Sequence, residues 1–142
     1  MECPYCHSPK LDVVNSRKNA REQFVWRRRR CQECGLAFTT HERFFLDDLV
    51  IVRGTNKKTY PYHSSELLAK VSHACDHLHS VDKTVWLVRT IETSFMQHVT
   101  PLKDKLVINE GILHKSVLAV LSGYDKVSAI KYAAQENIPF EV

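Results

Sequence analysis

The chain carries two different patterns of hydrophobic and polar positions, and the pattern changes near residues 44–49. In the first part, apolar residues come in short clusters separated by polar and charged residues. The clusters are Leu11, Val13 and Val14, followed by Phe24, Val25 and Trp26. Such clusters predict strands. We therefore expect a β-hairpin or three short strands here, with residues 15–21 as the turn region.

The second part of the chain repeats its aliphatic residues at the spacing of amphipathic helices. Before them, residues 49–53 and 59–62 predict a hairpin across a turn at 54–57. Helices are then expected at roughly 64–78, 82–98, 109–122 and from 125 onward.

Short polar residues and a glycine predict where these helices begin and end. We expect Ser64 or Ser65 to cap the first helix and Asp125 to cap the fourth. Gly123 is expected to end the third. The side chains expected to face inward from the fourth helix are Val127, Ile130 and Ala134.

Composition places the chain in a reducing compartment. The chain has 142 residues and no apolar run near 18 residues, so it predicts no membrane span. The N-terminus, Met-Glu-Cys-Pro, lacks the basic and then apolar stretch of a signal peptide. We expect a cytoplasmic protein with reduced thiols and no membrane partner.

Two Cys-x-x-Cys pairs frame the first 34 residues: Cys3 with Cys6, and Cys31 with Cys34. The two-residue gap lets both thiolates of a pair point at one tetrahedral ion, and two such pairs complete a site of four sulfurs. Thiolates in this geometry select zinc or iron, with zinc favoured. Two disulfides are the alternative, which a reducing compartment disfavours.

A metal site changes the prediction for the polar first part, which cannot bury a core of its own and needs the metal as a substitute. The chain is therefore expected to be an α+β protein. Residues 1–46 form a small β zinc ribbon, and residues 47–142 form a mainly helical domain with a short β-hairpin.

Positive charge is concentrated in the ribbon. The formal net charge is +4, and residues 17–30 contain Arg17, Lys18, Arg21 and the run Arg27, Arg28, Arg29, Arg30 against Glu22 alone. Along an extended strand Arg27 and Arg29 share one face, and Arg28 and Arg30 share the other. Phosphates relieve repulsion among adjacent guanidinium groups, and arginine reads guanine edges in the major groove. We expect double-stranded DNA as the partner.

Other interpretations of the arginine run stay open. A solvated charge run that only keeps the ribbon in solution is the plainest of them. RNA or an acidic protein are the other partners that such a run fits.

Five segments of the chain occur in the order of a known family. They are Cys3-Pro4-Tyr5-Cys6, Val14-Asn15-Ser16-Arg17, Trp26 to Arg30, Cys31-Gln32-Glu33-Cys34-Gly35, and Phe38-Thr39-Thr40-His41-Glu42. This order resembles the NrdR family, bacterial repressors of ribonucleotide reductase operons. Asn15 stands where that family usually has an aspartate. The resemblance implies that Arg17 and Arg27 to Arg30 contact operator DNA.

The same resemblance implies that the second domain is an ATP-cone, which binds ATP or dATP and thereby sets the oligomeric state and the affinity for DNA. Arg53, Lys57 and Lys58 are the residues we expect to hold the phosphates. Departures from the family keep an alternative open, because Glu66 stands where a lysine is usual. In that alternative the second domain is a degenerate cone that forms homo-oligomers and senses no nucleotide.

An enzyme is the least favoured class. No His, Asp and Cys residues stand at catalytic spacing, and no Gly-Lys-Ser/Thr phosphate loop occurs. Four thiolates also leave no open position on the metal for a reacting water. We expect a DNA-binding regulator without catalytic activity.

Overall fold

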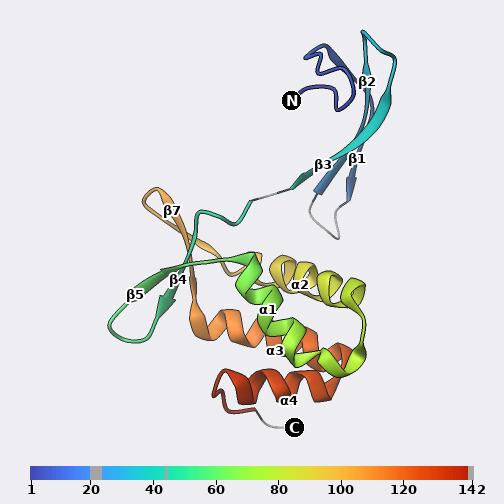
Figure 1. Ribbon diagram of the computed structural model, residues 1–142. Helices are drawn as coiled ribbons and strands as arrows, with labels where there is room; N and C mark the ends of the chain where they lie inside the picture. Colours follow the sequence, from blue (N-terminus) through green and yellow to red (C-terminus); the bar gives the residue numbers. More distant parts are fainter. Residues whose placement is uncertain (20–23, 44, 141–142) are drawn as a thin grey trace. The chain divides into compact units, whose positions relative to one another are not determined.

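The computed structural model describes residues 1–19, 24–43 and 45–140. The chain divides into two compact units, Met1–Phe45 and Leu46–Val142, called unit 1 and unit 2 (Figure 1). Unit 1 is built from strands, and unit 2 combines helices with a second sheet, so the α+β class is confirmed. In the part of the chain that is described, no helix has the length and apolar character that crossing a bilayer requires.

Unit 1 is an antiparallel sheet in the order β1-β2-β3, formed by β1 (Leu11–Asn19), β2 (Phe24–Cys31) and β3 (Ala37–Arg43). The pairing of β1 with β2 contains one bulge, between Val13 and Asn15. A β-hairpin or three strands were expected, and the structure has three, but β1 continues through most of the expected turn. In this stretch Asn15 and Ser16 lie opposite Arg28 and Arg27, and residues 17–19 lie opposite the apolar cluster 24–26 of β2, so the ladder continues with apolar residues on one strand alone. Residues 20 and 21 of that turn lie outside the described residues.

Unit 2 contains a mixed sheet in the order β5-β4-β7-β6. The expected hairpin is present as β4 (Leu49–Arg53) and β5 (Lys58–Pro61). A second hairpin, β6 (Thr100–Leu102) and β7 (Lys105–Asn109), was not expected from the sequence. Its strand β7 pairs in parallel with β4, from Leu49 opposite Leu106 to Val52 opposite Asn109. The domain therefore has a sheet where one hairpin was predicted.

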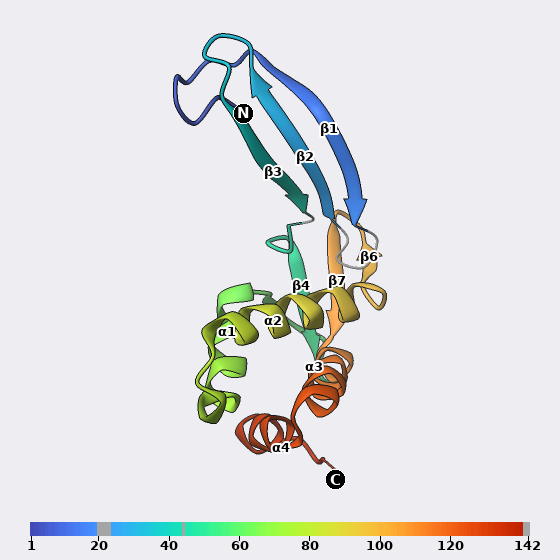
Figure 2. The same cartoon turned by 90° about the vertical axis from the view of Figure 1, so that its right-hand side faces the viewer.

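The helices of unit 2 pack in a ring that Figure 2 shows nearly end-on. They are α1 (Ser64–Ala74), α2 (Val81–Met96), α3 (Glu110–Tyr124) and α4 (Lys126–Gln135), with a 3-10 turn, η1 (Asp76–Leu78), after α1. Helix α1 contacts α2 and α4, and α3 contacts the same two. The core inside the ring includes the fully buried Val71, Leu87, Ile91, Phe95, Val117 and Leu121. Burial of such side chains stabilises the unit by about 1.5–3 kcal/mol each.

The expected helix ends are confirmed at one position and wrong at two. Asp125 does cap α4, because its Oδ2 accepts hydrogen bonds from the Ser128 N–H and hydroxyl, both at 2.7 Å. Helix α1 begins after His63, which makes no side-chain cap, and the Ser64 hydroxyl instead donates to Glu92. Helix α3 continues through Gly123 to Tyr124.

The expected inner face of α4 is also wrong. Val127 and Ile130 are largely exposed, and the buried residues are Ser128, Ala129, Tyr132 and Ala133. The cap explains the rotation, because the Ser128 hydroxyl and N–H must both reach Asp125 at the buried start of the helix. A small polar side chain therefore occupies a position that an apolar pattern would not select.

Candidate functional site

The sulfur atoms of Cys3, Cys6, Cys31 and Cys34 form one cluster in unit 1. Their Sγ atoms all lie within 4.8 Å of one another. Cys3 Sγ is 3.6 Å from Cys34 Sγ, and Cys6 Sγ is 3.5 Å from Cys31 Sγ. A tetrahedral ion with bonds of about 2.3 Å to each sulfur needs sulfurs about 3.8 Å apart. The predicted metal ligands are therefore brought together at the spacing that zinc requires.

Two matching backbone turns build this cluster. The N–H of His7 donates to the carbonyl of Cys3, and the N–H of Gly35 donates to the carbonyl of Cys31, both at 3.0 Å. The residue after each pair has a positive φ, 58° at His7 and 74° at Gly35. Each turn folds the chain back so that the two thiols of a pair point the same way.

The thiols of the cluster differ in acidity. The backbone N–H of Cys6 lowers the pKa of Cys3 to about 7, and the N–H of Cys34 lowers that of Cys31. The N–H of Ser8 also favours the thiolate of Cys6, yet burial and the neighbouring thiols raise its pKa to about 12. Four thiolates this close repel each other, and a divalent cation removes that repulsion. The donor set fits a structural zinc ion, and its four sulfurs close the coordination sphere.

Strand β2 carries the arginine run directly into Cys31, and the register separates the run into two faces. Residues opposite each other on neighbouring strands share a face. Arg27 lies opposite Ser16 and Thr40, whereas Arg28 lies opposite Asn15 and Thr39. The expected alternation is therefore present in the structure.

On one face of the sheet two arginines share a single carboxylate. Glu42 accepts a hydrogen bond from Arg27 Nε at 2.7 Å and one from an Arg29 amino group at 3.2 Å. Arg27 also donates to Ser16, and Arg29 donates to Thr40. The Arg27 contact is the main reason that the pKa of Glu42 lies below its usual value. We call this side the Glu42 face.

The opposite side, which we call the open face, presents Arg17, Trp26, Arg28 and Arg30. Arg17 lies opposite Trp26, and the three arginines are exposed. Arg28 donates to the Thr39 hydroxyl at 3.1 Å. On the described strands, the carboxylate that the register places here is Asp12, which accepts a hydrogen bond from Gln32 at 2.7 Å. No carboxylate of a described residue pairs with the three arginines.

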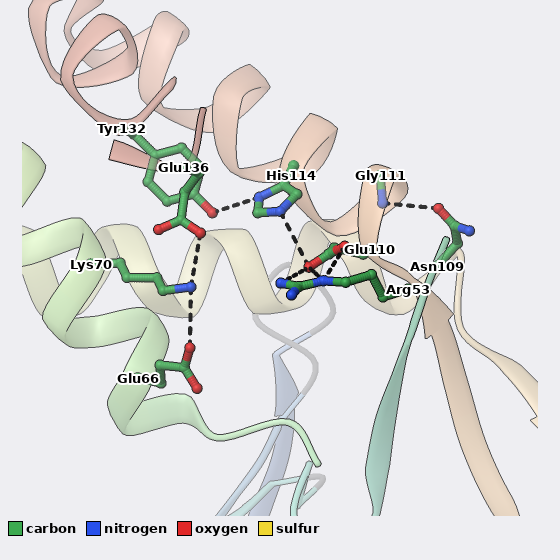
Figure 3. Close-up of polar contacts among 9 residues, drawn as sticks. All are labelled: Arg53, Glu66, Lys70, Asn109, Glu110, Gly111, His114, Tyr132 and Glu136. Carbon is green, nitrogen blue, oxygen red and sulfur yellow. Dashed lines mark hydrogen bonds and ion pairs between the residues drawn. The ribbon is translucent and has the colours of Figure 1, made fainter. Parts of the chain in front are cut away.

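Of the residues expected to hold phosphates in unit 2, Arg53 lies directly opposite Lys58 in the β4–β5 ladder, and Lys57 precedes Lys58. Arg53 lines a cavity of about 150 Å³ together with residues of α1, α3 and α4, but Lys57 and Lys58 are not part of its lining. They lie at the exposed end of the β4–β5 hairpin. Arg53 itself makes a two-oxygen hydrogen bond to Glu110, with Nε at 2.6 and 2.8 Å (Figure 3).

A second set of paired charges lies at the same cavity, whose lining includes Glu66 and Lys70 but not Glu136. Lys70 Nζ lies 2.9 Å from Glu136 and 3.1 Å from Glu66, as Figure 3 shows. Burial alone would lower the pKa of Lys70, but the hydrogen bonds to these carboxylates outweigh it and raise that pKa. The spacing of Glu66 and Lys70 by four residues could be seen in the sequence. The contact of Lys70 with Glu136 could not be seen there, because the two residues lie 66 positions apart along the chain.

His114 and Tyr132 complete this network. The Tyr132 hydroxyl lies 3.0 Å from His114 Nδ1. Burial lowers the pKa of His114, which favours the neutral imidazole. Its other nitrogen, Nε2, is 3.9 Å from Glu110, which is too long for a hydrogen bond.

Comparisons with known proteins agree with this architecture. The model for the N-terminal domain of transcriptional repressor NrdR-like proteins, a zinc ribbon, matches residues 1–42. The chain is 32% identical over 135 residues to the transcriptional repressor NrdR of Chloroflexus aggregans, covering 94% of this chain and 74% of that protein. It is 34% identical over 134 residues to the protein of the same name from Thermus thermophilus, covering 94% and 82%. A third relative of that name, from Mesorhizobium japonicum, is 32% identical over 139 residues, covering 94% and 81%.

Proposed function

Since the chain belongs to the NrdR family of transcriptional repressors, we propose that it represses transcription by binding operator DNA through the open face of its zinc ribbon. The observation that carries this proposal is the separation of the arginine run by Glu42. Arg27 and Arg29 already share the carboxylate of Glu42, whereas Arg17, Arg28 and Arg30 are exposed and have no carboxylate partner among the described residues. Unpaired guanidinium groups on one face suit a phosphate backbone.

Zinc has an indirect part in this function. When bound, the ion supplies the cross-link that an apolar core would supply in a larger domain. Cys31 ends β2, so fixing its thiolate also fixes the register of the strand that carries the arginines. Trp26 lies on the same face and offers an aromatic surface beside Arg28.

The salt dependence of DNA binding can distinguish the contribution of the open face from that of the Glu42 face. We expect Arg28→Ala combined with Arg30→Ala to reduce the slope of log affinity against log salt by roughly two, because each lost phosphate contact removes about one. Arg27→Ala combined with Arg29→Ala should reduce it much less. Fluorescence anisotropy with a labelled 30-base-pair duplex measures both, with zinc content as the check on folding. Equal losses from the two pairs would refute the open face as the DNA contact.

The regulated genes are proposed to be those of ribonucleotide reductase, which the likeness to the NrdR ribbon supports. A duplex from the region upstream of these genes should bind more tightly than a promoter duplex of equal length from an unrelated gene. Competition between the two duplexes at one salt concentration measures the ratio. Equal affinity for the two duplexes would indicate DNA binding without sequence preference and would contradict the proposal that these genes are the target.

Control of the repressor has two candidate forms. In the first, ATP or dATP binds unit 2 and changes the number of copies that assemble on DNA. In the second, unit 2 only holds copies together and does not respond to triphosphates. The pairing of Arg53 with Glu110, and of Lys70 with two carboxylates, favours the second form.

Mass in solution distinguishes the two forms. Under the second form we expect one mass, above that of a single chain, with no nucleotide, with ATP and with dATP. Light scattering after gel filtration gives that mass directly. A change of mass between nucleotides would establish the first form, and a single-chain mass under every condition would contradict both.

A further inference from the structure

The open face of unit 1 carries aromatic rings as well as arginines. Strand β2 places Phe24 and Trp26 on this face, at the two alternate positions before Arg28. On β3, His41 lies directly opposite Trp26 and therefore shares the same face. Three rings thus gather at the end of β2 that is remote from the zinc cluster, and the exposed arginines continue from them along the strand.

The indole of Trp26 has no partner among the described residues. It makes no ring contact, cation–π contact or hydrogen bond there. The side chain is partly exposed, and it lies between Arg17 on β1 and His41 on β3. A tryptophan that serves only as core is usually covered and finds a partner for its N–H. This ring is therefore available to a ligand that has a flat face.

Phe24 shows which kind of group the rings of this face accept. The guanidinium carbon of Arg43 lies over its ring, 5.0 Å from the centroid. The His41 ring centroid is 4.8 Å from that of Phe24, with 39° between the ring planes. Both neighbours are planar. Planar guanidinium groups and aromatic rings are also the surfaces on which proteins stack unpaired bases.

The spacing of the rings suits unpaired bases better than paired ones. Residues on the same face of a strand are about 6.8 Å apart, since the chain rises about 3.4 Å per residue. Stacked bases of one strand are only about 3.4 Å apart, so bases resting on Phe24 and on Trp26 cannot also stack directly on each other. A duplex keeps its base faces covered and offers base edges in its grooves. A single strand can turn its bases outward.

The charges beside the rings suit the backbone of such a strand. Arg17 lies next to Trp26, and Arg28 and Arg30 follow along β2, all exposed and without a carboxylate partner among the described residues. Glu42 engages only the arginines of the other face. A positively charged surface with aromatic side chains between the charges is the arrangement that binds single strands. An acidic protein would use the charges and leave the rings without a role.

We propose that the open face also binds single-stranded nucleic acid, with unpaired bases stacked on Trp26 and Phe24 and phosphates held by Arg17, Arg28 and Arg30. Single-stranded DNA and RNA share this chemistry. The inference goes beyond the binding of operator duplex and does not require it. Where both ligands are present, the single strand competes with the duplex for the same arginines.

Stacking is separated from phosphate binding by a strand without bases. Fluorescence anisotropy of the full-length, zinc-loaded protein is measured with labelled oligothymidine and oligouridine, and with an abasic oligonucleotide of the same length as the control. At least one strand that carries bases is expected to bind about tenfold or more tightly than the abasic strand. If neither does, the proposal is overturned. Binding of strands without binding of a duplex supports this inference and contradicts the proposed function.

The role of the indole is tested by substitution. Trp26→Ala is expected to weaken single-strand binding about tenfold, and Trp26→Phe should retain most of it because a ring remains. Tyr5→Ala removes an exposed ring in the first Cys-x-x-Cys turn, outside the sheet, and is the control. The loss caused by Trp26→Ala should be smaller for a duplex, whose base faces are covered. Equal losses for strand and duplex, or for Trp26→Ala and Tyr5→Ala, would refute stacking on Trp26. Zinc content confirms that each variant has a folded ribbon.

The stacking can also be observed directly, because the chain has only two tryptophans, Trp26 and Trp86. Trp86→Phe changes an exposed position of α2 in unit 2 and leaves Trp26 as the single indole. A base stacked on an indole quenches its fluorescence. Oligothymidine should therefore quench this variant, and the quenching should reach its limit at the same concentration as the anisotropy. Binding without quenching would show contact through phosphates alone and would contradict the proposal.

Discussion

At the scale of single residues, the zinc site depends on backbone conformation as much as on the cysteines. His7 and Gly35 occupy equivalent places after the two Cys-x-x-Cys pairs, and both have positive φ. Only glycine adopts this region without steric cost, which for other residues is about 1–2 kcal/mol. One of the two turns is therefore strained by its side chain and the other is not.

We expect a glycine at position 7 and an alanine at position 35 to change the stability of the zinc site in opposite directions. His7→Gly should strengthen zinc retention by about 0.5–1 kcal/mol, because it removes the strain at a small entropic cost. Gly35→Ala should weaken retention by about 1 kcal/mol, although no atom lies within 4 Å of the added methyl group. The chelator concentration that releases half of the zinc measures both changes. Shifts in the same direction would contradict the role of φ.

At the scale of elements, helix α4 depends for its position on Asp125, the N-cap residue that precedes it. Asp125 accepts hydrogen bonds from the Ser128 hydroxyl and N–H, and His77 Nε2 lies 3.0 Å from the same oxygen. The contacts from Ser128, followed by that from His77, lower the pKa of Asp125 below its usual value. The carboxylate thus joins the start of α4 to the turn after α1.

Removing this cap should destabilise unit 2. Asp125→Ala is expected to cost about 1–2 kcal/mol in urea unfolding, and Asp125→Asn should cost less because it keeps a capping oxygen. The folded pKa is depressed, so the charge-dependent part of this stability is present above the unfolded pKa of about 3.9 and is lost as pH falls below it. Asp125→Asn should therefore show a weaker loss of stability than wild type between pH 5 and pH 3. Parallel pH profiles would contradict the cap.

Local patterns predicted most of the elements and missed those that depend on distant partners. Helices α2 and α3 lie within two residues of their expected bounds, because their apolar residues repeat over four turns. Strands β6 and β7 were missed because they are short and because β7 is stabilised by β4, far away along the chain. The inner face of α4 was wrong because Ser128 is buried by its hydrogen bond to Asp125, which hydrophobicity does not encode.

The same distinction holds for the candidate site. The zinc ligands could be predicted completely, because Cys-x-x-Cys spacing fixes their geometry locally. The sharing of Glu42 by Arg27 and Arg29 could not, because it needs the register of β2 against β3. The carboxylates around Lys70 come from the two ends of unit 2, so only the fold brings Glu66 and Glu136 to one amine.

At the scale of the whole molecule, the two units are stabilised by different means. Unit 1 buries Cys3 and Cys31 almost completely but has few other buried side chains. Unit 2 contains a continuous hydrophobic core in which Cys75 is also buried. The metal and the apolar core are therefore separate sources of stability, and each should be removable without the other.

Two cysteine substitutions test this separation. Cys31→Ser should abolish zinc binding and unfold residues 1–43, because the ribbon has no core to replace the metal. Unit 2 should keep its helices and its unfolding midpoint. Cys75→Ser should do the reverse, lowering the stability of unit 2 by about 1–3 kcal/mol through burial of a hydroxyl while zinc content is unchanged. Zinc analysis and urea unfolding followed by circular dichroism give both readouts. Loss of all helical signal in Cys31→Ser would show that the units do not fold independently.

Parallel pairing of β4 with β7 sets the order in which unit 2 can fold. Leu49 pairs with Leu106, and α1, α2 and β6 all lie between them along the chain. Closing so long a loop costs chain entropy before the ladder forms, so such contacts come late. During synthesis, unit 1 leaves the ribosome first and can take up its metal while β4 still lacks one neighbour. Until β7 emerges, the free edge of β4 is the part of the nascent chain most exposed to pairing with another molecule.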